Sequence, residues 1–356
     1  MDQQLDVVSP VDWAVAADVA AALVRPGPTV SRGEGADLVV SLRSAADAAV
    51  GHVARITEMV PSPGTGTGPV ARTQVIDRRT WVRANARMLA DLTRDVPSTR
   101  GPSTVSRWTA GAQAGSVLAL VASRVLGQFD PFTGTNDRNG PRPRTLMLVA
   151  PNVLRMERSL DVVPADFRLW VALHEQTHVL QFAAAPWLTE HLRRRAATLL
   201  ADLAASPDGP DDSGPLRARL TSLLSRSDED APGIETLLTP SQREAFEDLG
   251  AVMAVLEGHA DVTMDAVGRE VVPSVETIRT RFDQRRNGTG RMDRTMRRLL
   301  GLDQKMAQYR DGAAFVREVR RAVGTAGVNA VWVGPQNLPS PREVADPRAW
   351  VRRVHG

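Results

Sequence analysis

The chain has 356 residues, of which 42% are hydrophobic and 24% charged, as is typical of a globular protein with one large or two moderate domains. It contains no cysteine, which excludes disulfides, thiolate metal ligands and cysteine nucleophiles. Its net charge is only +3, and its arginines alternate with apolar positions, so we do not expect a nucleic-acid partner. We find neither a bilayer-spanning segment nor a secretory signal, and we expect a cytoplasmic protein without a membrane partner. The oligomeric state is left open.

Hydrophobic periodicity predicts a mainly helical chain. The expected helices are 11–25, 36–59, 75–96, 103–129, 152–160, 166–185, 187–204, 216–224, 240–267, 274–285, 291–300 and 303–323, followed by a short one near the C-terminus. Residues 60–69 and 130–144 are expected to be loops, 145–150 a strand, and Ala330 to Val333 a second strand. The acidic segment 205–235, rich in proline and glycine, is expected to be mobile. We expect one domain over 1–356, with a helical part at 1–130 and a functional part at 131–356.

The stretch 166–187 contains the pattern H-E-x-x-H at His174, Glu175 and His178. Residues four apart on a helix lie about 40° apart around its axis, so both imidazoles can reach one ion. Apolar residues surround the pattern up to Pro186, and polar groups in such a helix need partners, which a metal ion supplies. The pattern therefore predicts a metal site. Gln176 stands where zinc proteases usually have an apolar residue.

Two histidines leave a zinc site one protein ligand short. The strongest candidate is Glu257, in the mostly apolar segment 254–264. Asp261 shares its helix face and could accept the second N–H of a ligating histidine. The competing interpretation pairs Glu257 and Asp261 with arginines. His259 points roughly 200° away from Glu257 on the helix, so we interpret it as a polar residue with partners near the cleft. The other histidines are expected to be ordinary surface or helix-end residues: His52, His191 and His355.

Lys305 is the only lysine and Tyr309 the only tyrosine of the chain, and they lie four apart on one helix face. A chain that uses arginine almost everywhere else could keep these two for chemistry. Tyr309 is our candidate for a catalytic hydrogen-bond donor to an oxyanion, with Lys305 as the alternative. The competing interpretation is that Tyr309 is a packing residue with a hydrated hydroxyl.

These residues carry a resemblance to known families. H-E-x-x-H followed by E-x-x-x-D resembles the gluzincin type of zinc peptidase, with Glu257 at the place of its glutamate ligand and Asp261 at that of its supporting aspartate. Nearly the whole chain is similar to an actinobacterial family of predicted zinc-dependent metalloproteases, some members of which are described as deazaflavin coenzyme biosynthesis-associated. The segments that carry this similarity are 75–85, 125–132, 167–187, 256–268, 301–315 and 337–347. The resemblance implies bound Zn²⁺ and a mainly α (α+β), zincin-like core with a small sheet among additional helices.

Together these features predict a zinc-dependent metallopeptidase or hydrolase. His174, His178 and Glu257 would hold Zn²⁺, and Glu175 would act as general base in the hydrolysis of a peptide or small amide. The alternative is a metal-binding protein that is not a peptidase, either a scaffold or a small-molecule amidohydrolase linked to coenzyme metabolism. A di-iron carboxylate protein would need a second E-x-x-H on a facing helix, but Glu257 has Ala260 at the third place.

Overall fold

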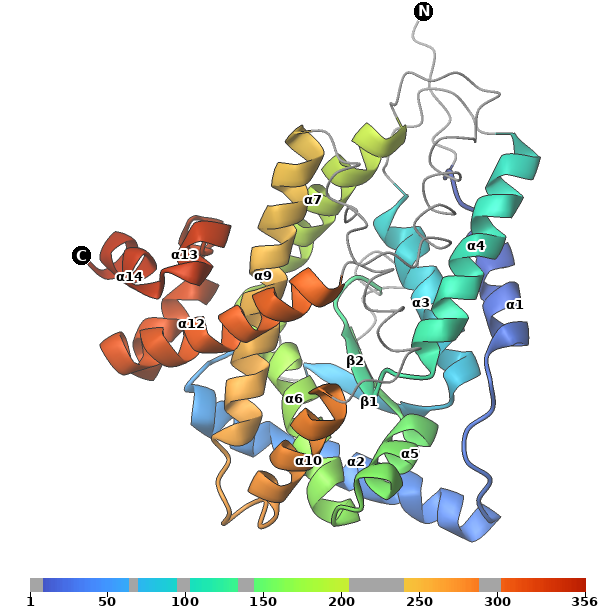
Figure 1. The fold of residues 1–356 in the computed structure, drawn as a ribbon, viewed down its shortest axis with the longest axis horizontal. Helices are drawn as coiled ribbons and strands as arrows, with labels where there is room; N and C mark the ends of the chain where they lie inside the picture. The colour runs from blue at the N-terminus through green and yellow to red at the C-terminus, as the bar shows by residue number, and fades with distance from the viewer. Residues whose placement is uncertain (1–8, 64–69, 95–102, 134–143, 205–239, 288–301) are drawn as a thin grey trace, which may run out of the picture.

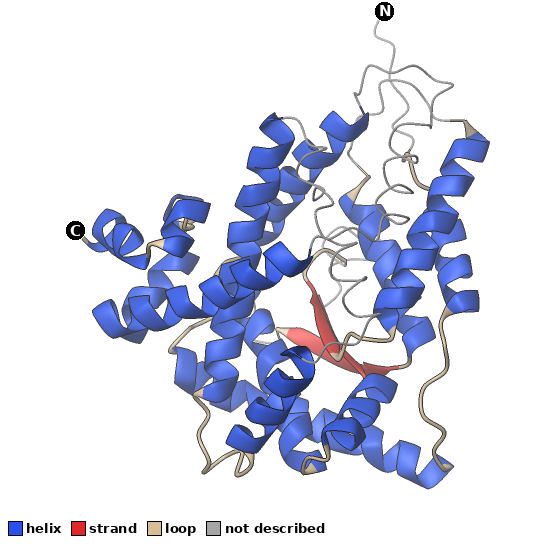
Figure 2. Ribbon diagram, viewed as in Figure 1, coloured by secondary structure: helices blue, strands red, loops and turns tan. Residues whose placement is uncertain are grey.

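The computed structural model describes residues 9–63, 70–94, 103–133, 144–204, 240–287 and 302–356. Figure 2 shows a small sheet surrounded by helices, as the mainly helical α+β expectation required. The expected helices at 216–224 and 291–300 and the segment 205–235 lie outside the described residues. No helix in the described ranges combines the length and the apolar content that crossing a bilayer requires.

The helices follow the predicted order closely. They are α1 (Trp13–Leu23), α2 (Arg32–Thr57), α3 (Arg78–Leu92), α4 (Thr104–Ala122), α5 (Ala150–Leu160), α6 (Pro164–Ala184), α7 (Trp187–Ala204), α9 (Pro240–Asp265), α10 (Val275–Asn287), α12 (Leu302–Val328), α13 (Pro341–Ala345) and α14 (Pro347–His355). Two short 3-10 helices, η2 (Asn329–Trp332) and η3 (Pro335–Asn337), connect α12 to α13.

The sheet has the order β1-β3-β2, with β1 at Ala71–Ile76, β2 at Gly127–Asp130 and β3 at Arg144–Val149. β1 runs parallel to β3, and β2 runs antiparallel to it with Gly127 opposite Leu148. The strand predicted at 145–150 is therefore confirmed within one residue. Leu146 and Leu148 are fully buried on one face of the sheet.

Three sequence expectations about strands were wrong. The expected helix 75–96 begins only at Arg78, because Asp77 caps α3 by accepting a hydrogen bond from Thr80 N at 2.7 Å, and β1 precedes it. The expected helix 103–129 ends at Ala122, and its last residues pair with β3 as β2. The strand expected at 330–333 is instead the 3-10 helix η2, whose backbone hydrogen bonds, such as Val333 N to Ala330 O, join residues three apart.

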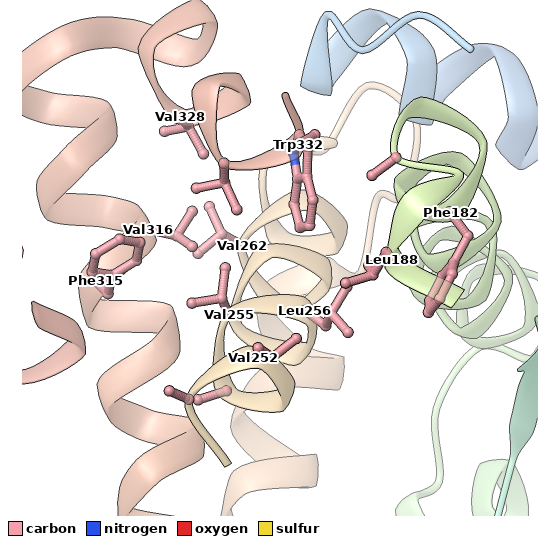
Figure 3. Close-up of a cluster of buried hydrophobic side chains, with 14 of the residues drawn as sticks. Phe182, Leu188, Val252, Val255, Leu256, Val262, Phe315, Val316, Val328 and Trp332 are labelled. Carbon is pink, nitrogen blue, oxygen red and sulfur yellow. The ribbon is translucent and has the colours of Figure 1, made fainter. Parts of the chain in front are cut away.

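Helix α6 lies at the centre of the fold (Figure 1). It packs against α2 and α9 and also contacts β2 and β3. One core cluster joins α2, α5, α6 and α10, and another joins α6, α9, α12 and α14. Figure 3 shows the second cluster, in which Leu256 of α9 lies near Leu188 and Phe182, while Val255 and Val316 lie between α9 and α12. This arrangement places α6 and α9 side by side, with α2 packed against α6 and α12 packed against α9.

Glycines allow two helix pairs to approach very closely. A Cβ at Gly115 of α4 would lie 2.5 Å from Ala16 O of α1, and Gly111 makes a similar approach to Asp12. The small residues on this face of α4 therefore pack directly against α1. Gly258 of α9 and Gly312 of α12 meet in the same way, since a Cβ on either would overlap the backbone of the other helix. The backbone next to Glu257 is thus in direct contact with α12.

Candidate metal centre

The two histidines of the pattern lie together on one face of α6. The helix begins with Pro164 in its first turn, and Asp166 anchors it by accepting hydrogen bonds from Ser274 N at 2.9 Å and Ser274 Oγ at 2.6 Å. The i, i+4 spacing brings the Nε2 atoms of His174 and His178 within 3.2 Å of each other, with the ring planes 84° apart. Both nitrogens therefore point into one small volume.

Glu257 of α9 completes this group. Its Oε2 lies 3.3 Å from His174 Nε2, and its Oε1 lies 3.6 Å from His178 Nε2. In the part of the chain that the structure describes, these three residues are the one cluster with metal-ligand geometry, and their ligand atoms lie within 4.8 Å of one another. Residues 79 positions apart thus meet because α6 and α9 pack side by side.

The spacing of these atoms fits a zinc ion. Ligand atoms placed tetrahedrally about 2.0–2.1 Å from zinc lie about 3.3 Å apart. The observed separations of 3.2, 3.3 and 3.6 Å agree with that value. The side chains of His174, His178 and Glu257 are 22%, 12% and 34% exposed, so the group is partly accessible to solvent. A set of two imidazoles and one carboxylate with an open side is typical of catalytic zinc sites.

The charges in this group shift the pKa values of both histidines. Burial lowers the pKa of His174, but the hydrogen bond and charge of Glu257, with smaller contributions from Glu175 and Asp261, outweigh it and raise the pKa to about 9. Burial also lowers the pKa of His178, where Glu257 opposes and the neighbouring His174 adds to the effect. A cation is therefore favoured at this point, and a metal ion can take the place of the proton on His174.

Glu175 lies buried beside the first strand residue of β2. A Cβ at Gly127 would lie 2.6 Å from its Cδ and 2.7 Å from its Oε1, so glycine at this position leaves room for the carboxylate where it now lies. Burial raises the pKa of Glu175 to about 7, against the opposing charge of His174, and Glu257 raises it further. A carboxylate whose pKa lies near neutrality can both accept and return a proton at physiological pH.

The outer nitrogens of the two histidines have different partners. Nδ1 of His178 lies 2.9 Å from Oε1 of Gln181, one turn further along α6. Nδ1 of His174 lies 3.3 Å from the thioether sulfur of Met264 on α9. His259 is buried, its Nδ1 contacts Gln181, its ring packs on Trp332, and burial lowers its pKa to about 3. His259 lies beside the site, and it contributes none of the three converging ligand atoms.

Asp261 does not take the place that we expected for it. Arg279 of α10 donates to its Oδ1 from both terminal nitrogens at 3.1 Å. Asp261 therefore pairs with an arginine, as the competing interpretation expected. The same guanidinium pairs with Asp265 at 2.6 Å and lies 5.4 Å above the ring of Trp170. Arg279 thus links α9 and α10 to α6 within one turn of Glu257.

Other residues singled out in the sequence lie elsewhere. Gln176, the unusual residue in the pattern, is buried and donates to Ala46 O of α2 at 3.1 Å, so it joins two helices. Tyr309 and Lys305 belong to α12, but their side chains lie outside the described residues. The remaining histidines have local contacts away from the site: His52 with Arg55, His191 with Trp187 and His355 with Gly327 O.

Three residues around the candidate site escaped the sequence analysis. Gln181 had a usable signal, because a polar residue three positions after a ligating histidine on an apolar helix lies on nearly the same face. Gly127 had none, because its role depends on how β2 packs against α6. Arg279 likewise gave no local signal.

A family model and a solved structure are similar to this chain. A family model described as zincin-like metallopeptidase matches residues 11–351. A crystal structure of a "putative hydrolase with a novel fold" from Chloroflexus aurantiacus has a TM-score of 0.67 and 29% sequence identity to this chain. The similarity covers 96% of this chain and 98% of that chain. No curated protein matches.

Proposed function

Because the chain belongs to the zincin-like metallopeptidase family, we propose that it is a zinc-dependent hydrolase that cleaves amide bonds in a gluzincin-like manner. His174, His178 and Glu257 serve as the metal ligands. The observation that supports this most strongly is the convergence of three ligand atoms at tetrahedral spacing beside a buried glutamate with a pKa of about 7.

Zinc, when bound, acts as a Lewis acid and lowers the pKa of a coordinated water from 15.7 toward about 7. Glu175 is the general base in this proposal. Its carboxylate accepts a proton from the attacking water and later passes it to the leaving amine, which its near-neutral pKa allows. Gly127 leaves the space in which that carboxylate sits. General acid–base catalysis of this kind typically contributes 10²–10⁴-fold.

Binding and orientation fall to the remaining groups. Glu257 contributes the negative charge of the donor set, and Arg279 neutralises the carboxylates of Asp261 and Asp265 that follow it on α9. Tyr309 stays our candidate for a donor to the oxyanion, since α12 crosses α9 three residues later, at Gly312. The substrate class in this proposal is a peptide or a small amide.

Metal analysis combined with a substrate screen tests the proposal. Protein purified without chelators should carry one zinc per chain, measured by mass spectrometry of the elements. The wild type should cleave members of a mixture of peptides and small amides, followed by mass spectrometry. Glu175→Gln should keep the zinc and lose at least 10²-fold in rate. A wild type without stoichiometric zinc would refute the proposal at its first step, and stoichiometric iron would point to a different chemistry.

A further inference from the structure

The buried amide of Gln181 has hydrogen bonds with a definite direction. Its Nε2 lies 3.0 Å from the backbone oxygen of Leu256, an atom that can only accept. The amide nitrogen must therefore face α9, and the amide oxygen must face Nδ1 of His178, 2.9 Å away. The second amide hydrogen points to Nδ1 of His259 at 3.1 Å, so that ring nitrogen accepts. The orientation of Gln181 is thus fixed by two acceptors on α9.

This direction determines which tautomer His178 adopts. An amide oxygen only accepts, so Nδ1 of His178 must carry the ring hydrogen. A neutral imidazole has a single N–H, and Nε2 therefore presents its lone pair. Nε2 is the atom that lies 3.2 Å from His174 Nε2 and 3.6 Å from Glu257. The hydrogen bond that His178 Nδ1–H donates to Gln181 Oε1 selects the form of His178 that can bind a metal ion.

Among the residues that the structure describes, His174 has no comparable support. The acceptor at its Nδ1 is the sulfur of Met264, and a thioether is a weak acceptor. Asp261, the next carboxylate along α9 after Glu257, is engaged by Arg279. The two ligating imidazoles are therefore unequal: one is held by an oriented amide, and the other by a weak contact.

We propose that Gln181, held in place by Leu256 and His259, is the positioning residue that fixes the tautomer and ring orientation of His178 and thereby sets the affinity of the site for zinc. This inference rests on the proposed function. The partner is a neutral amide rather than the carboxylate found behind many ligating histidines, so it orients the ring without adding charge to a site that already holds Glu257 and Glu175.

The chain offers a matched control in Gln176. Both glutamines are buried on α6, and both donate Nε2 to a backbone oxygen of a facing helix, at 3.1 Å to Ala46 for Gln176 and at 3.0 Å to Leu256 for Gln181. Only Gln181 contacts a ligand. Replacing either residue by leucine removes a similar interhelical hydrogen bond, so an effect of packing alone would appear in both variants.

The experiment has two readouts. In metal-free protein, ¹⁵N NMR of the histidine rings should show His178 protonated at Nδ1. The second readout is zinc affinity, measured by competition with a chromophoric chelator. Gln181→Leu should weaken zinc binding by about 10–100-fold, whereas Gln176→Leu should stay within about threefold of wild type. Gln181→Glu keeps an acceptor for Nδ1 and should bind zinc more tightly than Gln181→Leu.

The outcomes separate this inference from the proposed function. If the wild type binds zinc and Gln181→Leu binds it equally well, the role of Gln181 is refuted while the metal centre stands. If metal-free wild type carries the His178 hydrogen on Nε2, the inference is refuted without any variant, so a Gln181→Leu chain that fails to fold does not rescue it. If the wild type does not bind zinc, the proposed function fails and the inference with it.

Discussion

Replacing Gly127 by alanine should impair the proposed general base, Glu175, while leaving zinc binding by the proposed metal ligands nearly unchanged. A Cβ at this position would lie 2.6 Å from Cγ and Cδ of Glu175, whereas ordinary contacts begin near 3.4 Å. Either the carboxylate or β2 must therefore move by about 0.8 Å. The three heavy atoms nearest to that Cβ all belong to Glu175, and none belongs to His174, His178 or Glu257.

The size of the effect follows from that displacement. A misplacement of about 1 Å at a catalytic group can cost on the order of 10²-fold in rate. Such a loss corresponds to roughly 2.7 kcal/mol in the activation barrier. We therefore expect Gly127→Ala to lower kcat/KM by up to about 10²-fold on a substrate that the wild type cleaves, while zinc affinity stays within about threefold.

Steady-state kinetics and chelator competition on the same preparations provide the measurement. Gly51→Ala is the control for a glycine-to-alanine change, because nothing lies within 4 Å of a Cβ at Gly51. If Gly127→Ala keeps kcat/KM within threefold of wild type, the contact with β2 does not position Glu175. If zinc affinity falls in parallel with the rate, the change acts on the whole site and the reasoning also fails.

Four further predictions concern the ligands and their supports. Glu257→Gln should weaken zinc binding by about 10²-fold or more in chelator competition, because a charged ligand is lost. Since the pKa of His174 is about 9, zinc must displace a proton at lower pH, and its apparent affinity should rise about tenfold per pH unit between pH 7 and 9. In metal-free protein at pH 8, Glu175→Gln should raise the free energy of unfolding by up to roughly 3 kcal/mol, because burial moves this pKa from 4.5 to about 7. Gly258→Ala should lower the free energy of unfolding by about 1–3 kcal/mol through overlap with α12, while Gly51→Ala should raise it by about 0.5–1 kcal/mol.

The sign of the Glu175 prediction follows from proton binding. The folded state holds this proton more tightly than the unfolded state does, so the stabilisation is complete below pH 4.5 and is lost as the pH rises through 7. Urea unfolding at pH 4.5 should therefore show little difference between wild type and Glu175→Gln. An equal gain at both pH values would contradict the assignment. A flat pH profile of zinc affinity would likewise contradict a raised pKa at His174.

Local patterns were enough to bring the ligand candidates forward. The H-E-x-x-H spacing depends only on helix geometry, and Glu257 was conspicuous as an acid within an apolar helix. The close contact at Gly111 was also predictable, because a row of small residues on one helix face has few other uses. These features are encoded within one or two turns of a single helix.

Features that depend on partners distant in sequence were not predictable in this way. β2 has only four residues, and it is a strand because β3 lies beside it. Asp261 has the right spacing to support a histidine, but its carboxylate is instead hydrogen-bonded to Arg279 of α10. Nothing in the local sequence reveals that approach. The cap at Asp77, by contrast, was a local signal that would have set the start of α3 correctly.

The side-by-side packing of α6 and α9 has a consequence for how such a centre could be transferred. His174, Glu175, His178 and Gln181 come from α6, while Glu257 and the outer contacts at Leu256, His259 and Met264 come from α9. The sheet contributes one glycine. The candidate ligand set therefore comes from two helices alone, and a designed bundle that reproduces this single crossing and leaves space beside Glu175 would contain all of its donor atoms.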